Sequence, residues 1–295
     1  MQPLDSAIKN CPLTKFIDSL DITPSTGRVD IENELKSIES DQHNAIKIFY
    51  SRLKNYYSSI PSQYEDIKTY CCSYLNFWLN KEKEKKSTSE PYINTNGWQV
   101  IENLWEMLNG PFSCKRKRFE KSTEDQKKCI DFMVYCVNRE VLKKECVDTK
   151  DNYLKQLYCT NFDNFTNKYY EEFKKAIPCL RNTNKDYNWT FSDTCTLHNM
   201  AITFPKYNDT IGKIMDVNTR NQIKKCENNE ESSIIDCYML EGVPVTFEEV
   251  SPSIDISPWK FGFYGGSSLL GFLCLSVFLY KVKKINSQNI HILKL

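Results

Sequence analysis

Apolar residues recur every three or four positions in five stretches of the first 240 residues, which is the spacing of an amphipathic helix. The pattern predicts five helices whose apolar faces meet in a core rich in aromatic rings. In chain order these residues are Leu35, Ile38, Ala45, Ile46, Phe49 and Leu53 within 29–57; Tyr64, Ile67, Cys71, Tyr74, Leu75 and Trp78; Trp98, Ile101, Leu104, Trp105 and Leu108; Cys129, Phe132, Met133, Cys136 and Val137; and Phe162, Phe165, Tyr169, Phe173 and Ala176.

Local signals indicate where some of these helices begin. Ser62 and Glu65, which follow Pro61, predict a capping box at the start of the second helix, and Ser122 with Asp125 predicts the start of the fourth. Only five of the nine glycines precede residue 261, which leaves few tight turns for an all-β or doubly wound fold. The predicted fold class is therefore mainly α, in a domain large enough to bury a core.

The twenty residues from Phe261 to Tyr280 carry no charge and are followed by Lys281, Lys283 and Lys284. At about 1.5 Å per residue they cover roughly 30 Å, the thickness of the hydrocarbon part of a bilayer. A buried helix of the core is the alternative, but a chain with a mean hydropathy of −0.54 does not need one that is so uniformly apolar. The pattern therefore predicts a single C-terminal transmembrane helix.

The span divides the chain into a disulfide-linked helical part, a short proline-bearing stalk, the membrane helix and a short tail. The lysines after the span place the tail in the cytosol and the N-terminal body outside. The start of the chain shows no apolar core of a signal peptide, so a tail-anchored protein with a cytosolic body is the alternative. The predicted parts are a cysteine-rich ectodomain at 1–240, the stalk at 241–260, the transmembrane helix at 261–280 and the cytosolic tail at 281–295.

The number of cysteines favours an N-terminal body outside the cytosol over a cytosolic, tail-anchored one. The chain has thirteen cysteines, of which Cys274 lies in the predicted span and twelve precede it. Zinc binding is one alternative, but the chain has no Cys-x-x-Cys pair and only three histidines; buried thiols are another, although twelve would be unusual in a reducing cytosol. We expect a disulfide framework of open connectivity, with at least one bridge between neighbouring helices. The candidates are Cys11, Cys71, Cys72, Cys114, Cys129, Cys136, Cys146, Cys159, Cys179, Cys195, Cys226 and Cys237.

Lys115, Arg116, Lys117 and Arg118 form a dense cluster of positive charge. Clustered cations raise the local potential, so these residues are candidates for binding a polyanion such as a sulfated glycan or sialic acid. A solvated loop is the alternative, and a nuclear import signal conflicts with the predicted span and the cysteines. The net charge of +1 gives no further reason to expect nucleic acid.

The sequence predicts neither an enzyme nor a cofactor or metal site. It contains no phosphate loop, dinucleotide fingerprint, His-Glu-x-x-His or Gly-x-Ser-x-Gly motif. A cysteine nucleophile paired with His198 is the alternative, because catalytic groups assemble in space. We expect the cysteines to pair with one another instead.

Three Asn-x-Thr sequons begin at Asn164, Asn188 and Asn208. Such sequons are acceptors for N-linked sugars in external domains. Their presence agrees with the predicted topology.

The segment Cys72-Ser-Tyr-Leu-Asn-Phe-Trp-Leu79 resembles the C-x-Y-L-x-x-W-L element of the Plasmodium interspersed repeat (PIR/VIR) proteins. Pro12-Leu-Thr-Lys-Phe16, the order of the later cysteines, the stalk, the span and the lysine-rich tail follow the same architecture over most of the chain. The tandem Cys71-Cys72 departs from the family pattern, so no disulfide pairing is carried over.

The resemblance implies a variant surface antigen of a malaria parasite, displayed on or exported to the infected red cell. Its implied role is immune evasion or adhesion, with host receptors, host glycans or antibodies as partners and no nucleic acid. A structural or trafficking component of an exported membrane compartment is the alternative.

Overall fold

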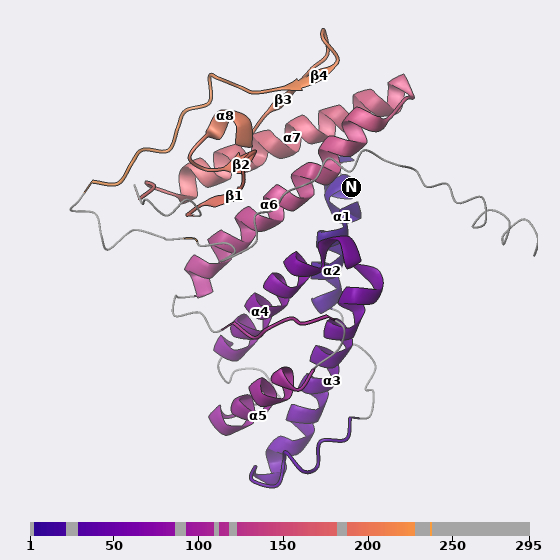
Figure 1. Ribbon diagram of the computed structural model, residues 1–295, viewed down its shortest axis with the longest axis vertical. Helices are drawn as coiled ribbons and strands as arrows, with labels where there is room; N and C mark the ends of the chain where they lie inside the picture. The colour runs from indigo at the N-terminus through magenta and orange to yellow at the C-terminus, as the bar shows by residue number, and fades with distance from the viewer. Residues whose placement is uncertain are drawn as a thin grey trace, which may run out of the picture. The chain divides into compact units, whose positions relative to one another are not determined.

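The computed structural model describes residues 3–21, 29–85, 93–108, 112–117, 123–181, 188–227 and 237. The chain divides into two compact units, residues 1–245 and 246–295, and every described residue belongs to the first. Most of the described residues are helical (Figure 1). The elements are α1 (Pro3–Asn10), α2 (Pro12–Asp21), α3 (Ser40–Gln63), the 3-10 helix η1 (Glu65–Ile67), α4 (Lys68–Glu84), α5 (Thr95–Glu106), α6 (Thr123–Asp148), α7 (Asn152–Ala176), β1 (Thr190–Ser192), β2 (Cys195–Thr196), α8 (Met200–Thr203), β3 (Lys206–Asn208) and β4 (Lys213–Met215).

The predicted fold class requires correction. The structure is mainly helical and contains cysteine pairs, but none of the helices in the described ranges is both long and apolar enough to cross a membrane. The transmembrane helix predicted at 261–280, like the stalk and the tail, lies outside the described residues. The fold class is therefore a mainly helical, disulfide-linked domain with two small antiparallel hairpins, β1–β2 and β3–β4.

The predicted capping box after Pro61 is wrong. Helix α3 continues through Pro61 to Gln63, and Ser62 donates its hydroxyl to the carbonyl of Ser58 at 3.2 Å instead of capping a new helix. Ile60, which is fully buried, anchors this last turn of α3 to the core. Helix α4 consequently begins only at Lys68, and α3 begins at Ser40 rather than near residue 29.

The other three helices follow their predicted stripes. Asn94 caps α5 by accepting from the backbone N–H of Gly97 at 2.9 Å, and Asp151 caps α7 by accepting from that of Leu154 at 2.8 Å. Helices α6 and α7 lie side by side and antiparallel (Figure 1). Helices α1 and α2 were not predicted from the periodicity of the sequence.

The centre of the α6–α7 packing is the ring of Tyr135, which is completely buried. It stacks on Phe165 at 5.4 Å and on Phe204 at 4.9 Å between ring centroids, and its hydroxyl donates to the carbonyl of Thr203 at 2.6 Å. Burial raises the pKa of this phenol well above its usual range, so the hydroxyl stays a hydrogen-bond donor. The ring therefore joins α6, α7 and the segment that follows α8.

Arg139, also buried, fixes the β1–β2 hairpin to α6. Its guanidinium donates to the carbonyls of Thr194 at 2.6 Å and Thr203 at 3.0 Å, and it pairs with Glu140. The disulfide between Cys136 and Cys195 lies one turn away on the same helix. The hairpin is therefore held by a covalent bond and by charge-assisted hydrogen bonds.

We expect the Cys136–Cys195 bridge to contribute strongly to stability. Replacing both residues by alanine should lower the free energy of unfolding by about 2–5 kcal/mol, because the bridge closes a long loop in the unfolded chain. The matched control is Cys129→Ala, which removes a half-buried thiol of the same helix and should have a much smaller effect. Urea unfolding followed by circular dichroism without reductant measures both, and equal midpoints for the two variants would contradict the expectation.

Candidate functional site

Eight of the twelve candidate cysteines form four disulfides in the structure. One of these bridges, between Cys146 and Cys159, joins the neighbouring helices α6 and α7, as expected. Cys11, Cys71 and Cys129 carry free thiols, and Cys237 is buried. The pairs are Cys72–Cys114, Cys136–Cys195, Cys146–Cys159 and Cys179–Cys226.

The tandem Cys71-Cys72 divides its two side chains between different environments. Cys72 bonds to Cys114, whereas Cys71 is a fully buried thiol in the core. Burial raises the pKa of Cys71 to about 12, and burial followed by the nearby Glu145 raises that of Cys11 to about 12. Neither buried thiol is therefore a nucleophile at neutral pH.

The element Cys72–Leu79 builds structure and does not form an exposed site. Trp78 stacks on Phe49 with ring centroids 5.3 Å apart, and Leu75 and Leu79 are fully buried. Asn76 donates to the carbonyl of Lys115 at 3.1 Å and accepts from the backbone N–H of Lys117 at 2.6 Å. The element thus holds the irregular segment 112–117 against α4 by a disulfide and by the hydrogen bonds of Asn76.

The basic cluster does not form one exposed patch. Only 3% of the Arg116 side chain is exposed; it lies 3.7 Å from the carboxylate of Glu102, which is equally buried, and donates to Asn76 at 3.2 Å. Its guanidinium lies 5.8 Å from the ring of Trp105. Lys115 and Lys117 are exposed, and Arg118 lies outside the described residues.

His198 is not placed beside a cysteine nucleophile. Its Nε2 lies 2.8 Å from the carbonyl oxygen of Asn188, and the nearest cysteine in sequence, Cys195, is in a disulfide with Cys136. In the described ranges no cluster of three or more His, Cys, Asp or Glu side chains has the geometry to hold a metal ion.

A different surface stands out in the described part of the chain. Of its seven exposed large hydrophobic side chains, six lie around the α6–α7 turn and the β3–β4 hairpin. Tyr153, with 78% of its surface exposed, is the most open of them. We call this set the α7 apolar face; its members are Val147, Tyr153, Leu154, Leu157, Ile211 and Met215.

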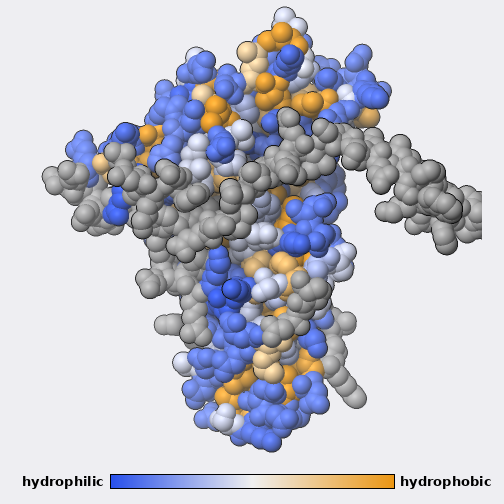
Figure 2. Space-filling model, in the orientation of Figure 1, coloured by the Kyte–Doolittle hydropathy of each residue, from blue (hydrophilic) through white to orange (hydrophobic). Residues whose placement is uncertain are grey.

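The hairpin joins this face because it runs along α7 toward the start of that helix. Phe204, which precedes β3, packs on Tyr170 at 5.7 Å, and the backbone N–H of Tyr207 donates to Asp163 at 2.7 Å. The chain therefore advances toward the N-terminus of α7 as it approaches the hairpin tip. Hydrophobic residues gather over this hairpin at the upper end of the molecule in Figure 2.

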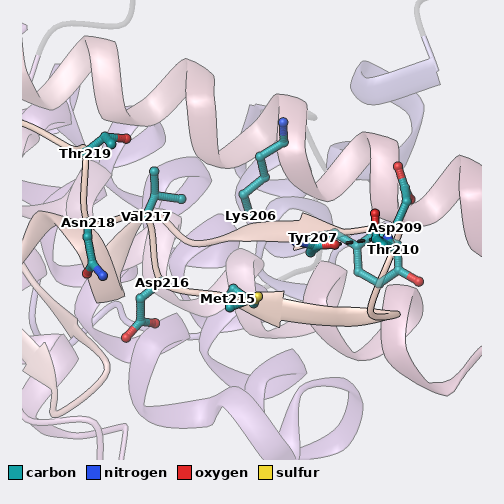
Figure 3. A pocket seen from close by; sticks show the side chains of 10 residues that line it. Lys206, Tyr207, Asp209, Thr210, Met215, Asp216, Val217, Asn218 and Thr219 are labelled. Carbon is teal, nitrogen blue, oxygen red and sulfur yellow. Dashed lines mark hydrogen bonds between the residues drawn. The ribbon is translucent and has the colours of Figure 1, made fainter.

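Asp163 fixes the hairpin on α7. Burial raises the pKa of this carboxyl, and the hydrogen bond from Tyr207 partly offsets that effect. An open groove of about 500 Å³ lies beside the hairpin and is lined mainly by polar side chains (Figure 3). Its lining residues are Lys206, Tyr207, Asn208, Asp209, Thr210, Met215, Asp216, Val217, Asn218 and Thr219.

Sequence reasoning missed the α7 apolar face. The predicted apolar stripe of α7 begins at Phe162, whereas Tyr153, Leu154 and Leu157 lie at the start of the same helix. Their position in the first two turns was a signal that these side chains have fewer neighbours to cover them.

Comparison of the chain with protein-family models, curated proteins and solved structures finds no match. The resemblance to the Plasmodium interspersed repeat proteins therefore stays a prediction from the sequence.

We expect Arg116 to act as a structural cation. Arg116→Ala should lower the free energy of unfolding by about 1–2 kcal/mol, because it removes a buried hydrogen bond to Asn76 and one of the two cations beside Glu102. The other cation, Lys83 at 2.7 Å, remains. Lys115→Ala and Lys117→Ala are matched controls on exposed side chains and should change stability by less than about 0.5 kcal/mol. Chemical denaturation measures all three, and an Arg116→Ala protein as stable as the controls would contradict the structural role.

The buried thiols should resist alkylation in the folded protein. At a pKa of about 12, Cys11 and Cys71 are thiolate in only about one molecule in 10⁴ at pH 8, and burial also blocks access. Iodoacetamide should modify Cys129 first and reach the other two only after unfolding. Peptide mass spectrometry before and after adding guanidinium tests this order, and labelling of Cys11 or Cys71 at the rate of Cys129 would disprove it.

Proposed function

We propose that this chain is an extracytoplasmic interaction protein, a malaria-parasite variant surface antigen of the PIR type, which binds a host protein through the α7 apolar face. The observation that carries the proposal is that six of the seven exposed large hydrophobic side chains of the described residues belong to the α6–α7 turn and the β3–β4 hairpin. Exposed apolar side chains gathered in one place are typical of protein interaction sites, whereas scattered ones are ordinary.

The four disulfides support an oxidising location for this domain. Disulfides persist in extracytoplasmic compartments and are rare in a reducing cytosol. The resemblance of Cys72–Leu79 to the PIR element agrees with this location. The two arguments share Cys72, which begins the motif and pairs with Cys114, and the other three disulfides lie outside the motif.

The chemistry of the face favours a protein over a polyanion as the partner. The exposed charges beside it alternate in sign, with Lys144, Asp148, Lys150 and Asp151 near the α6–α7 turn. Such a mixed polar rim around an apolar centre matches the composition of protein interfaces. The basic cluster gives weaker support to a polyanion, since Arg116 is engaged with Glu102.

Replacing Leu154 and Leu157 together by serine should weaken binding to the host cell. If they are hot-spot side chains, their loss costs about 2 kcal/mol or more, which is roughly a thirtyfold rise in Kd. The oxidised full chain is incubated with red cells and with endothelial cells, and bound protein is measured by flow cytometry across a concentration series. Leu154 and Leu157 are partly exposed, so the double variant should keep its fold.

The matched control is Met107→Ser. Met107 is the remaining exposed large hydrophobic side chain in the described ranges, with 61% of its surface exposed, and it lies at the end of α5. It should leave binding unchanged. Equal loss in both variants, or unchanged binding in the double variant, would contradict the proposed face, and a wild-type chain that binds neither cell would favour the trafficking role.

A further inference from the structure

The three Asn-x-Thr sequons look equivalent in the sequence, but the structure places them in different environments. Only 1% of Asn188 is exposed, and its side-chain oxygen accepts from the backbone N–H of Cys237 at 2.7 Å. The next residue, Trp189, is completely buried and has a φ of 54°. A sugar on Asn188 would therefore prevent this part of the core from closing.

The sequon at Asn164 lies within α7. Asn164 itself is exposed, but Thr166 is completely buried, and its hydroxyl donates to the carbonyl of Asp163 at 3.1 Å. The threonine hydroxyl that the sequon requires is therefore buried against α7. In the folded domain this acceptor cannot be presented without opening α7.

The sequon at Asn208 lies at the tip of the β3–β4 hairpin. The side-chain oxygen of Asn208 accepts from the backbone N–H of Thr210 at 3.0 Å and of Ile211 at 3.2 Å, which leaves its amide nitrogen outside these two bonds. Asp209 and Thr210 are exposed, and Gly212, with a φ of 67°, completes the turn. Asn208 itself is half-buried, so this is the one of the three sequons in which neither the asparagine nor the threonine is both buried and hydrogen-bonded within the core.

Asn208 also lines the open groove beside the hairpin, together with Asp209 and Thr210 at the same end of it (Figure 3). Amide, hydroxyl and carboxylate groups suit the hydroxyl and acetamido groups of an N-acetylhexosamine.

We propose that Asn208 is an N-glycosylation site and that neither Asn164 nor Asn188 carries a sugar in the folded protein. The donor class is a lipid-pyrophosphate-linked sugar that begins with N-acetylhexosamine. The bond from the sugar's anomeric carbon to phosphate oxygen breaks, a bond to the Asn208 amide nitrogen forms, and lipid pyrophosphate and a proton leave. The evidence for this inference is the sequon geometry and not the proposed binding function, although Asn208 shares its hairpin with Ile211 and Met215 of the α7 apolar face.

The test expresses the full chain behind a cleavable secretory signal in a glycosylating eukaryotic cell. Peptide mass spectrometry then determines which asparagines carry N-acetylhexosamine, an assay that detects even a single sugar. Only molecules in which Cys146 and Cys159 are disulfide-bonded are scored, since that bond shows that the chain folded in the oxidising compartment. Asn208 should be occupied, and Asn164 and Asn188 should not.

Two variants of the same sequon provide the control. Thr210→Ala should abolish the modification while keeping Asn208, and Thr210→Ser should retain it, because serine keeps the required hydroxyl. An unmodified Asn208 in disulfide-bonded wild-type protein would overturn the proposal. So would sugar on Asn188 or Asn164 in that same fraction.

Discussion

The burial of Tyr135 between α6 and α7 is the constraint on which the rest of the structure depends. A buried phenol is tolerated only when its hydroxyl has a partner, and here that partner is the carbonyl of Thr203. The hydrogen bond therefore fixes the position of α8 and β3 relative to the helix pair. The β3–β4 hairpin follows directly, so the same bond brings it to α7, where the hydrogen bond from Tyr207 to Asp163 fixes it.

The disulfides extend this helical core into irregular chain. Two of them, Cys72–Cys114 and Cys136–Cys195, tie a segment without helix to a helix and close separations of 42 and 59 residues. Cys179–Cys226 joins two irregular segments that are 47 residues apart in sequence. Irregular segments bury little apolar surface of their own, so loop closure in the unfolded state contributes much of their stability. Aromatic packing holds the helices, and covalent bonds hold what lies between them.

The sequence predicts those parts of the fold that depend on local periodicity. The stripes of α5, α6 and α7 were predicted correctly, because each helix buries one face. The start of α4 was predicted incorrectly, because α3 continues through Pro61 and the burial of Ile60 stabilises this last turn. Two features depend on contacts between residues that are distant in sequence, and no rule of residue spacing predicts such contacts. They are the pairing of Cys72 rather than Cys71 with Cys114, and the burial of Arg116 against Glu102.

The same distinction explains why the α7 apolar face escaped prediction, and it bears on the binding role that we propose for this face. Tyr153 and Leu157 belong to α7, the same helix that packs into the core further along. They are exposed because few residues of the folded chain lie beside them. Exposed side chains add little to folding, and a helix end that carries them tends to fray. The bridge between Cys146 and Cys159 prevents this by joining the last turn of α6 to the second turn of α7. The side chains are therefore presented on a backbone that is already ordered, which lowers the entropic cost of binding a partner.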